Sequence, residues 1–518
     1  MTMRWFSLLL VIGLSGLLSG CATNPVTGES ELALVGEGSE LEIGNKQYLP
    51  SRQMQGGDYT ADPALNRYVQ SVGKRLAAVA DRKLPYEFVI INDSTPNAWA
   101  LPGGKIAINR GLLLELRSEA ELAAVLSHEI VHAAARHGAQ GMERGMLLQG
   151  ALAVAGVVAS NSDYGGLAMG AAALGANLLD QRYSRDDELE ADHYGMIYMQ
   201  RAGYDPQAAV ALQETFVRLS EGKDRNWLSG LFASHPPSRE RVEKNQQLAR
   251  ELKVQRARVG TEKYRRMTAR LRRDKPAYEA YAMGLKQLKD APKAALKLAD
   301  RAIAIEPEEG SFHVLRGDAL TGLKRLKEAR KAYDEAVRLS GGFFEPYLKR
   351  GALQARLGET ATARQDLQKS FKLLPTADAQ YLLGQLAVAD GDQTAALKHF
   401  QQAAGSRSEV GKAAMQEMSR LDLSNNPARY LPTRIGYDGS GRLLVQVDNR
   451  SGATVGDLVV LVGRVDAGGG IYRGREVRLD RALRAGEKIR FRTSISGIGS
   501  QDQLRRYAAR VVRGRVLK

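Results

Sequence analysis

The stretch SHEIVHAAARH, residues 127–137, contains three of the seven histidines of the chain. His128 and His132 are four residues apart, so on an α-helix both imidazoles lie on one face, one turn apart. Glu129 follows the first histidine directly. In an H-E-x-x-H helix the two imidazoles bind zinc and the glutamate acts as a base toward water. The alternative is a helix with two surface histidines and no metal.

The residues around this motif predict one helix from about Glu119 to His137. Ser118 followed three residues later by Glu121 is the pattern of a capping box. Three consecutive alanines are strong helix formers, and no Gly or Pro interrupts the stretch before Gly138. We therefore expect one helix to hold both histidines.

A catalytic zinc site needs three protein ligands and one open position. Candidates for the third ligand lie in YSRDDELEADHYG, residues 183–195, which predicts a second helix that begins near Ser184 with acids in its first turn. Glu188 and Glu190 are rivals, because they point about 200° apart on a helix and cannot both face one ion. Taken alone, the segment would form a solvated acidic helix face.

The two segments together resemble the HtpX/BepA-type gluzincin metallopeptidases. The pattern H-E-[IV]-x-H-x-x-x-R-H and then S-R-x-x-E-x-x-A-D is matched by His128, Glu129, His132, Arg136, His137, Ser184, Arg185, Glu188, Ala191 and Asp192. The resemblance implies one zinc ion, with Glu188 as its third ligand, Glu129 as the base and Asp192 as the carboxylate that orients a ligand histidine. We also expect His137 to support or regulate the site.

The resemblance covers about the first 250 residues. Residues 92–113, NDSTPNAWALPGGKIAINRGLL, resemble the segment that precedes the zinc helix in this family, and they predict two short strands joined by a turn at Pro102 to Gly104. Such a hairpin either pairs with an extended substrate or packs under the helix. Both interpretations stay open.

Residues 234–242, SHPPSRERV, resemble the His-Pro loop of the same family. In some relatives this histidine can reach the metal and close the site, so the resemblance implies a regulatory role for His235, with Arg241 close by. Pro236 and Pro237 stiffen the chain after the histidine, which reduces the entropy lost when the ring is held in place.

The N-terminus predicts export from the cytoplasm. Arg4 and an apolar run from Phe6 to Leu18 precede LSGC, which ends at Cys21 and resembles a bacterial lipobox. We expect residues 1–20 to be a signal peptide and Cys21, the only cysteine, to carry lipid. Ala22 as the second mature residue favours the outer membrane. The alternative is an ordinary signal peptide and a free periplasmic chain.

Between the two predicted zinc helices lies an apolar stretch rich in Ala and Gly, residues 141–180. Its two apolar segments are each shorter than the ~20 residues that a membrane-spanning helix needs. They predict two helices packed over or beside the catalytic cleft. A lid or a segment that dips into the membrane is the alternative.

A repeat begins after about residue 260. Gly284, Gly317, Gly351 and Gly384 recur at spacings of 33, 34 and 33, and larger residues, such as Tyr333, follow 16 positions after the last three glycines. A period of about 34 is typical of tetratricopeptide (TPR) repeats, which stack into a solenoid with a concave groove. We expect the groove to bind a protein partner; a helical spacer is the alternative.

The last segment, residues 427–518, alternates apolar and polar residues between Gly-rich turns. This pattern predicts an antiparallel β-sandwich of about seven strands. Its 19 Lys and Arg against 8 Asp and Glu give a net charge of +11, of +16 for the whole chain. Outside the cytoplasm we expect no nucleic-acid partner. Anionic lipid head groups, lipopolysaccharide or an acidic protein would fit the charge, or the arginines simply line solvated strand faces.

These features predict a multi-domain protein of 518 residues: a signal peptide over 1–20, a mainly α-helical metallopeptidase domain with a small β-element over 21–260, an α-solenoid of TPR repeats over 261–425, and a basic β-sandwich over 427–518. The implied function is zinc-dependent cleavage of unfolded or misassembled envelope proteins, as quality control at the outer membrane. The alternative is a TPR scaffold or chaperone for outer-membrane assembly whose protease site is normally latent.

Overall fold

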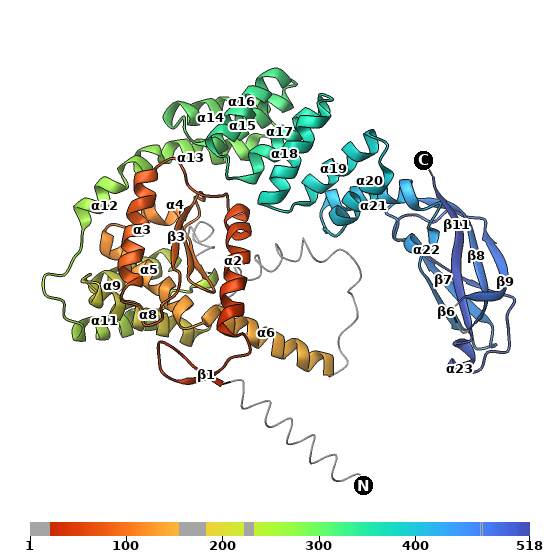
Figure 1. Ribbon diagram of the computed structural model, residues 1–518, viewed down its shortest axis with the longest axis horizontal. Helices are drawn as coiled ribbons and strands as arrows, with labels where there is room; N and C mark the ends of the chain where they lie inside the picture. The colour runs from red at the N-terminus through yellow and green to blue at the C-terminus, as the bar shows by residue number, and fades with distance from the viewer. Residues whose placement is uncertain (1–20, 155–182, 222–232, 467, 469, 518) are drawn as a thin grey trace, which may run out of the picture. The chain divides into compact units, whose positions relative to one another are not determined.

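The computed structural model describes residues 21–154, 183–221, 233–466, 468 and 470–517 (Figure 1). These residues form two compact units. The first unit runs through Leu353 and also includes Lys372–Leu374, and the second contains the other described residues from Gln354 onward. The sequence-predicted site and the first helical repeats belong to the first unit, and the C-terminal strands belong to the second.

Helix α5 (Glu119–Ala134) passes through the core of the first unit, and every residue of it except His128 is buried. A helix that is largely apolar on all sides must be covered all round. The helices that cover it or pack on its neighbours are α3 (Pro63–Ala77), α8 (Arg185–Arg201), α9 (Gln207–Glu221) and α11 (Arg239–Glu251). The other described elements before the repeats are β1 (Cys21–Thr23), β2 (Ser30–Leu32), α2 (Glu37–Met54), α4 (Arg110–Glu115), α6 (His137–Val154) and α12 (Thr261–Met267).

The start of α5 agrees with the sequence, but its end does not. Ser118 is the N-cap and accepts a hydrogen bond from the Glu121 amide at 3.0 Å. The second bond of the predicted capping box is not formed, because the Glu121 carboxylate accepts from the Arg117 amide at 2.7 Å instead of from that of Ser118. The predicted single helix to His137 is wrong, because Arg136 has a φ of 65°, in the left-handed region, and α6 starts afresh at His137. The Arg136 guanidinium donates to the Val35 carbonyl at 2.6 Å and to Glu31 at 2.9 Å. These buried contacts oppose continuation of the helix.

A three-stranded sheet lies beside α5, in the order β3 (Glu87–Ile91), β5 (Lys105–Asn109), β4 (Ala98–Leu101). The predicted hairpin is confirmed, since β4 and β5 pair antiparallel across a turn in which Gly103 and Gly104 have φ of 78° and 84°. Only glycine adopts such angles without strain. Strand β4 is the outer strand of this sheet and its residues are all buried.

The predicted repeat is a series of packed helices. They are α13 (Ala269–Gln287), α14 (Pro292–Ile305), α15 (Gly310–Gly322), α16 (Leu326–Leu339), α17 (Phe344–Arg356), α18 (Thr360–Leu373), α19 (Ala377–Ala389), α20 (Gln393–Ala404) and α21 (Glu409–Asp422). The recurring glycines lie where two helices meet. A Cβ on Gly317 would come within 2.4 Å of the Tyr333 ring, and one on Gly384 within 2.6 Å of the Phe400 ring. The period of the sequence therefore records close contacts between helices.

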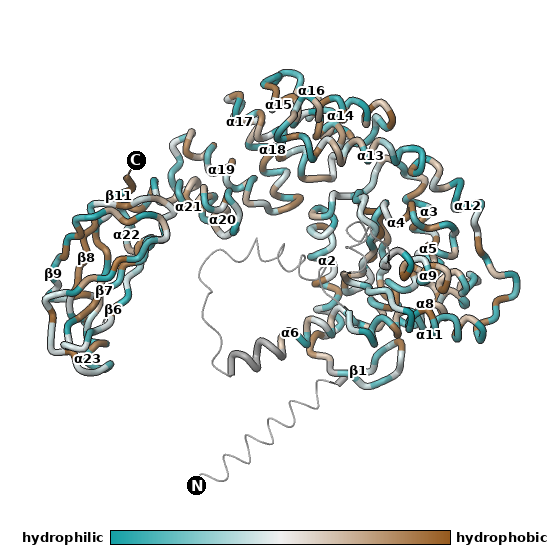
Figure 2. The backbone as a smooth tube through the Cα atoms, turned by 180° about the vertical axis from the view of Figure 1, so that it is seen from behind, coloured by the Kyte–Doolittle hydropathy of each residue, from teal (hydrophilic) through white to brown (hydrophobic). Residues whose placement is uncertain are grey.

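The C-terminal strands form two antiparallel sheets in the second unit, as predicted. One has the order β10 (Lys488–Arg492), β7 (Leu443–Asp448), β6 (Thr433–Tyr437), and the other β11 (Tyr507–Val516), β8 (Val455–Val465), β9 (Ile471–Leu479). The hydropathy colouring of β8 follows its run of buried Val and Leu (Figure 2). Buried residues of both sheets belong to one cluster with the last repeat helices. The described residues of this region form six strands where about seven were predicted, and the face-to-face sandwich stays a prediction. Two short helices, α22 (Pro427–Tyr430) and α23 (Gln501–Leu504), complete this region.

Two predicted segments fall partly or wholly outside the described residues. They are the signal peptide, 1–20, and most of the apolar stretch 141–180, of which α6 covers the part up to Val154. Among the helices that the structure describes, none combines the length and the apolar character needed to span a bilayer.

We predict that Gly317→Ala lowers the free energy of unfolding by about 1–3 kcal/mol, because the new methyl group would overlap a buried ring. The Tyr333 ring cannot move aside easily, since its hydroxyl donates to Asp318. Thermal and urea unfolding would measure the loss. Gly439→Ala is the matched control, because a Cβ there meets nothing within 4 Å. Equal stability of both variants would contradict the packing argument.

Candidate metal centre

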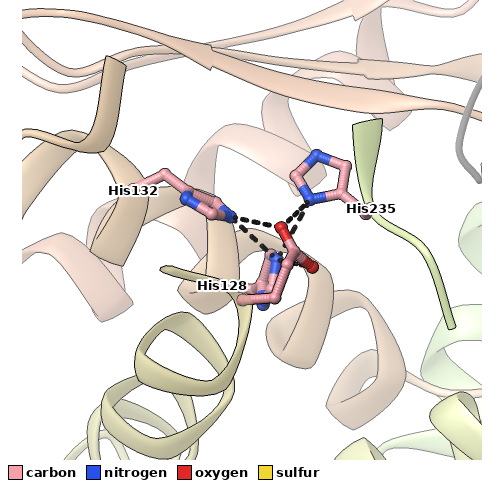
Figure 3. Close-up of side chains that lie close together, drawn as sticks. His128, His132 and His235 are labelled. Atoms are coloured by element: carbon pink, nitrogen blue, oxygen red, sulfur yellow. Dashed lines mark hydrogen bonds and ion pairs between the residues drawn. The ribbon is translucent and has the colours of Figure 1, made fainter. Parts of the chain in front are cut away.

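Four side chains from three parts of the chain converge at one point between α5 and α8 (Figure 3). His128, His132, Glu188 and His235 each offer one nitrogen or oxygen, and the four atoms lie within 4.8 Å of one another. The two histidines come from one face of α5, as their spacing predicts. Glu188 comes from the start of α8, and His235 from the segment just before α11.

The start of α8 is fixed by a reciprocal pair of hydrogen bonds. The Ser184 hydroxyl accepts from the Asp187 amide at 3.1 Å, and the Asp187 carboxylate accepts from the Ser184 amide at 2.8 Å. The predicted start near Ser184 is thereby confirmed. This capping box sets the phase of the helix, and the phase turns Glu188 inward to the histidines.

The distances between these atoms fit a shared ion. His128 Nε2 lies 3.0 Å from His132 Nε2 and 3.3 Å from His235 Nδ1. Glu188 Oε1 lies 3.3 Å from His132 Nε2 and 2.8 Å from His235 Nδ1. Ligands about 2.0–2.1 Å from a tetrahedral ion lie about 3.3 Å apart. Lone pairs this close repel one another unless a cation or a proton lies between them, so the donor set is consistent with a metal ion.

The charged and titratable groups of the cluster shift one another's pKa values. Burial lowers the pKa of His128, but Glu188 and Asp192 outweigh it and raise that pKa to about 10. Burial dominates at His132 and lowers its pKa well below the usual value. Burial raises the pKa of Glu188, and the charges of His235 and Arg241 more than reverse this effect. Glu188 is therefore held as an anion, the form that binds a metal.

Asp192 and Arg241 support the ligands from behind. His128 Nδ1 donates to Asp192 Oδ1 at 3.0 Å, so Nε2 is the ring nitrogen that faces the other side chains of the cluster. The Arg241 guanidinium donates twice to Asp192, at 2.7 Å each, and lies 2.6 Å from Glu188 Oε2. One arginine from α11 thus ties together both inner carboxylates of α8.

His137 contacts the His132 ring on the side away from the cluster, and Glu190 in turn contacts His137. The Nδ1 atoms of His132 and His137 are 2.8 Å apart, and His137 Nε2 lies 3.3 Å from Glu190 Oε1. The two rivals on α8 are therefore separated. Glu188 is brought among the imidazoles, whereas Glu190 is brought to His137, one residue removed from the ligand set.

Glu129 is buried beside the cluster without being part of it. Its Oε2 has no hydrogen-bond partner among the described residues, and its Oε1 lies 3.6 Å from His235 Nε2. Burial raises the pKa of this carboxyl group. A buried carboxylate with a free oxygen next to a metal site is suited to accept a proton.

A cavity of about 40 Å³ with one polar and one apolar set of lining residues opens beside Glu129 and His128. Its apolar walls come from Leu112, Ala124, Val125, Ala209, Leu212 and Phe216. A site for one water needs about 10–15 Å³ by the same measure, so the cavity has room for a small apolar side chain.

Two neighbours of the cluster were not singled out from the sequence. The Tyr183 ring stacks on His132, with ring centroids 3.8 Å apart and planes 18° apart. Gln213 donates to Asp192 at 3.5 Å. Tyr183 directly precedes the N-cap of α8, a position where a large apolar residue often packs back on the structure, and this signal could have identified it. Nothing in the sequence around Gln213 indicates its contact.

Comparisons with known proteins agree with this geometry. Residues 63–249 match the model of peptidase family M48, and residues 288–342 and 348–409 match a tetratricopeptide repeat model. The match to the peptidase family contains α5 and α8, and therefore also Glu188 and Asp192. The second match begins directly after α13 and ends at the start of α21, so the predicted TPR repeats are confirmed.

Among curated proteins, the chain is similar to the beta-barrel assembly-enhancing protease of Escherichia coli (strain K12), with 32% identity over 199 residues, 37% of this chain and 40% of that protein. It is also similar to the metalloprotease YcaL of the same strain, with 31% identity over 183 residues, 33% of this chain and 67% of that protein. A solved structure of MamA from Desulfovibrio magneticus RS-1 aligns with a TM-score of 0.26 and 18% identity, over 30% of this chain and 88% of that one. The chain spans only 40% to 54% of the length of the first curated relatives that it matches.

We predict that Glu188→Gln lowers the bound metal from about one ion per chain to near zero, because it removes the only charged ligand. Glu190→Gln is the matched control on the same helix and should keep its metal, since that carboxylate contacts His137 instead. Elemental analysis of both purified variants measures the difference. Loss of metal in the Glu190 variant alone would assign the ligand to Glu190.

Proposed function

The chain belongs to peptidase family M48, and from that premise we propose that it is a zinc-dependent endopeptidase with His128, His132 and Glu188 as metal ligands. One observation carries the proposal. The nitrogen and oxygen atoms that His128, His132 and Glu188 offer converge next to the buried carboxylate of Glu129, which is not one of the proposed ligands. Three protein ligands and a neighbouring base are the parts that a hydrolytic zinc site requires.

Each side chain of the site has a proposed task. Zinc would supply Lewis acidity, which polarises the scissile carbonyl and makes water more acidic. Glu129 accepts a proton from water and later donates it to the leaving amine. Asp192 and His137 hold the rings of His128 and His132 through their Nδ1 atoms, so that each ring keeps the required tautomer.

We also propose that the substrates are unfolded or misassembled proteins of the bacterial envelope. The apolar walls of the cavity beside Glu129 favour a substrate with an exposed apolar side chain, which folded proteins usually bury. The name of the E. coli relative refers to the assembly of β-barrels. A partner bound in the TPR groove would bring such substrates to the site. We propose a location in the periplasm with an anchor in the outer membrane, which the resemblance of residues 18–21 to a lipobox supports.

A scaffold with a latent protease site is the second candidate, and one observation favours it. His235 Nδ1 lies as close to His128 and Glu188 as those ligands lie to each other, so it can fill the fourth position around the ion. A zinc site with four protein ligands has no place for water. We propose that His235 is a latch and that the enzyme rests closed until substrate or a partner moves the segment before α11.

We predict that Glu129→Gln keeps its metal and loses cleavage of an unfolded model protein by about 10²–10⁴-fold, because the base is removed and the ligands are not. Metal analysis and cleavage assays measure the two effects. The same variant separates the two candidates in cells that lack the protein. A scaffold restores the envelope with Glu129→Gln, whereas a protease does not. Loss of metal would mean that Glu129 has a different role.

We predict that His235→Ala retains zinc and raises basal cleavage of the same substrate. The rise equals the inverse of the fraction of open molecules, about tenfold if one molecule in ten is open. His193→Ala is the control, because His193 lies on α8 outside the ligand cluster. Unchanged or lower activity in a folded, zinc-loaded His235 variant would exclude the latch and leave His235 as a substrate-side or structural residue.

We predict that Cys21→Ser moves the protein from the membrane fraction to the soluble periplasmic fraction, because the thiol that would carry the lipid is removed. Fractionation and metabolic labelling with a fatty acid measure the change. Continued membrane association of the variant would point to the apolar stretch 141–180 or to the arginine-rich C-terminal region.

A further inference from the structure

A large groove lies in the second unit, at the junction of the last repeat helices with the C-terminal strands. Its volume is about 1130 Å³, and it is lined by residues of α20, α21, α22 and β11 and by the loops between them. Figure 1 labels these elements side by side in the second unit. From Met415 onward the lining residues lie beyond both segments that match known families. We call this feature the junction groove.

The walls of the junction groove are held together by tertiary contacts. The Ser419 hydroxyl of α21 donates to the Ser451 carbonyl at 2.5 Å, and Gln416 donates to the Gly452 carbonyl at 2.9 Å. Tyr430 donates to Asp422 at 2.9 Å, and buried residues from the helices and from both sheets form one cluster. The groove is therefore formed by packed elements, and a ligand would find it preorganised.

The charged residues that line the junction groove are all basic. Its lining includes Arg429, Arg450 and Arg510, and none of the described lining residues is acidic. Arg429 lies 3.5 Å from Asp422 and over the ring of Tyr430. Arg450 and Arg510 are exposed, and neither side chain has an ion-pair or hydrogen-bond partner among the described residues. Two guanidinium groups are thus free to pair with carboxylates, which they bind with two parallel hydrogen bonds each.

The remaining lining suits a peptide better than a free anion. The apolar part of the lining comes from the partly buried Met415 and from the buried Met418, Tyr430 and Val511 at its base. Methionine adapts its shape to different apolar partners. Strand β11 is the outer strand of its sheet, and outer strands pair readily with extended chains. A volume above the ~300–1,000 Å³ of small-molecule sites also favours a chain segment.

We propose that the junction groove binds an extended peptide segment in which carboxylates alternate with apolar side chains. The two unpaired arginines, Arg450 and Arg510, select the carboxylates, and the apolar lining around Met415 accepts the apolar side chains. This binding site is separate in sequence from the zinc ligands and needs no metal. It gives the basic C-terminal region a protein ligand and lets the chain hold an acidic partner independently of cleavage.

The test measures binding of a labelled peptide in which Asp alternates with Leu to the full chain carrying Glu129→Gln, which prevents cleavage. Fluorescence anisotropy gives the Kd. The double variant Arg450→Gln, Arg510→Gln should raise the Kd at least about tenfold, since two charge-assisted pairs are lost. Arg478→Gln with Arg506→Gln is the matched control. It removes the same charge from exposed positions of the same region outside the groove, and it should change the Kd less than about twofold.

Four outcomes would overturn the proposal. The first is no binding of the Asp-Leu peptide to the chain with intact arginines. The second is equal weakening by both arginine pairs, which would mean diffuse charge attraction. The third is equal binding of a peptide with Asn in place of Asp, which would exclude carboxylate recognition. The fourth is binding of phosphatidylglycerol vesicles, but not of the peptide, through Arg450 and Arg510, which would assign the groove to lipid head groups.

Discussion

Two carboxylates buried one turn apart on α8, Glu188 and Asp192, impose the main constraint on the first unit. Removing such charges from water costs several kcal/mol each unless partners neutralise them. Arg241 contacts both carboxylates, and His128 donates to Asp192. The Glu188 carboxylate faces imidazole nitrogens, and the lone pairs of these nitrogens also favour a cation. Because these groups come from α5, α8 and α11, the three helices can pack closely only in the arrangement that brings the metal ligands together.

The same kind of constraint fixes the end of α5. Arg136 is buried with Glu31, Glu40 and Glu143 around it, and this network keeps the backbone in the left-handed region. The chain therefore turns at Arg136, and His137 starts a new helix with its ring against His132. A continuous helix would place His137 five residues beyond His132, about 140° away around the axis, where the two rings could not meet. The left-handed backbone at Arg136 thus allows the His137 ring to contact His132.

Local patterns in the sequence predicted the parts of the fold that local physics determines. The N-cap at Ser118, the helix start near Ser184, the hairpin turn at Gly103 and the 34-residue period each express a short-range requirement, and each has its counterpart in the structure. The break at Arg136 could not be predicted, because its cause lies in acids up to 105 residues away in the sequence. The contact of Gln213 at the site and the junction groove also arise from long-range packing, whereas the position of Tyr183 just before the N-cap of α8 was a local signal. The ligand set itself came from a family resemblance as well as from spacing.

The first repeat helices are part of the body that holds the metal centre. Tyr278 and Phe312 belong to the same buried cluster as α5, and the Arg110 guanidinium lies 3.3 Å above the ring of Tyr278. Gln53 donates to the Gly342 carbonyl and accepts from the Phe344 amide, both at 2.8 Å. Deleting the repeats from residue 261 would therefore expose core residues of the peptidase region and unfold it, whichever function the repeats have. For this reason point substitutions such as Glu129→Gln separate a protease from a scaffold, and removal of the repeat array does not. The contacts also provide a physical route by which a partner on the early repeats can act on the loop that precedes β4, since Asn92 donates to Glu309 at 3.0 Å.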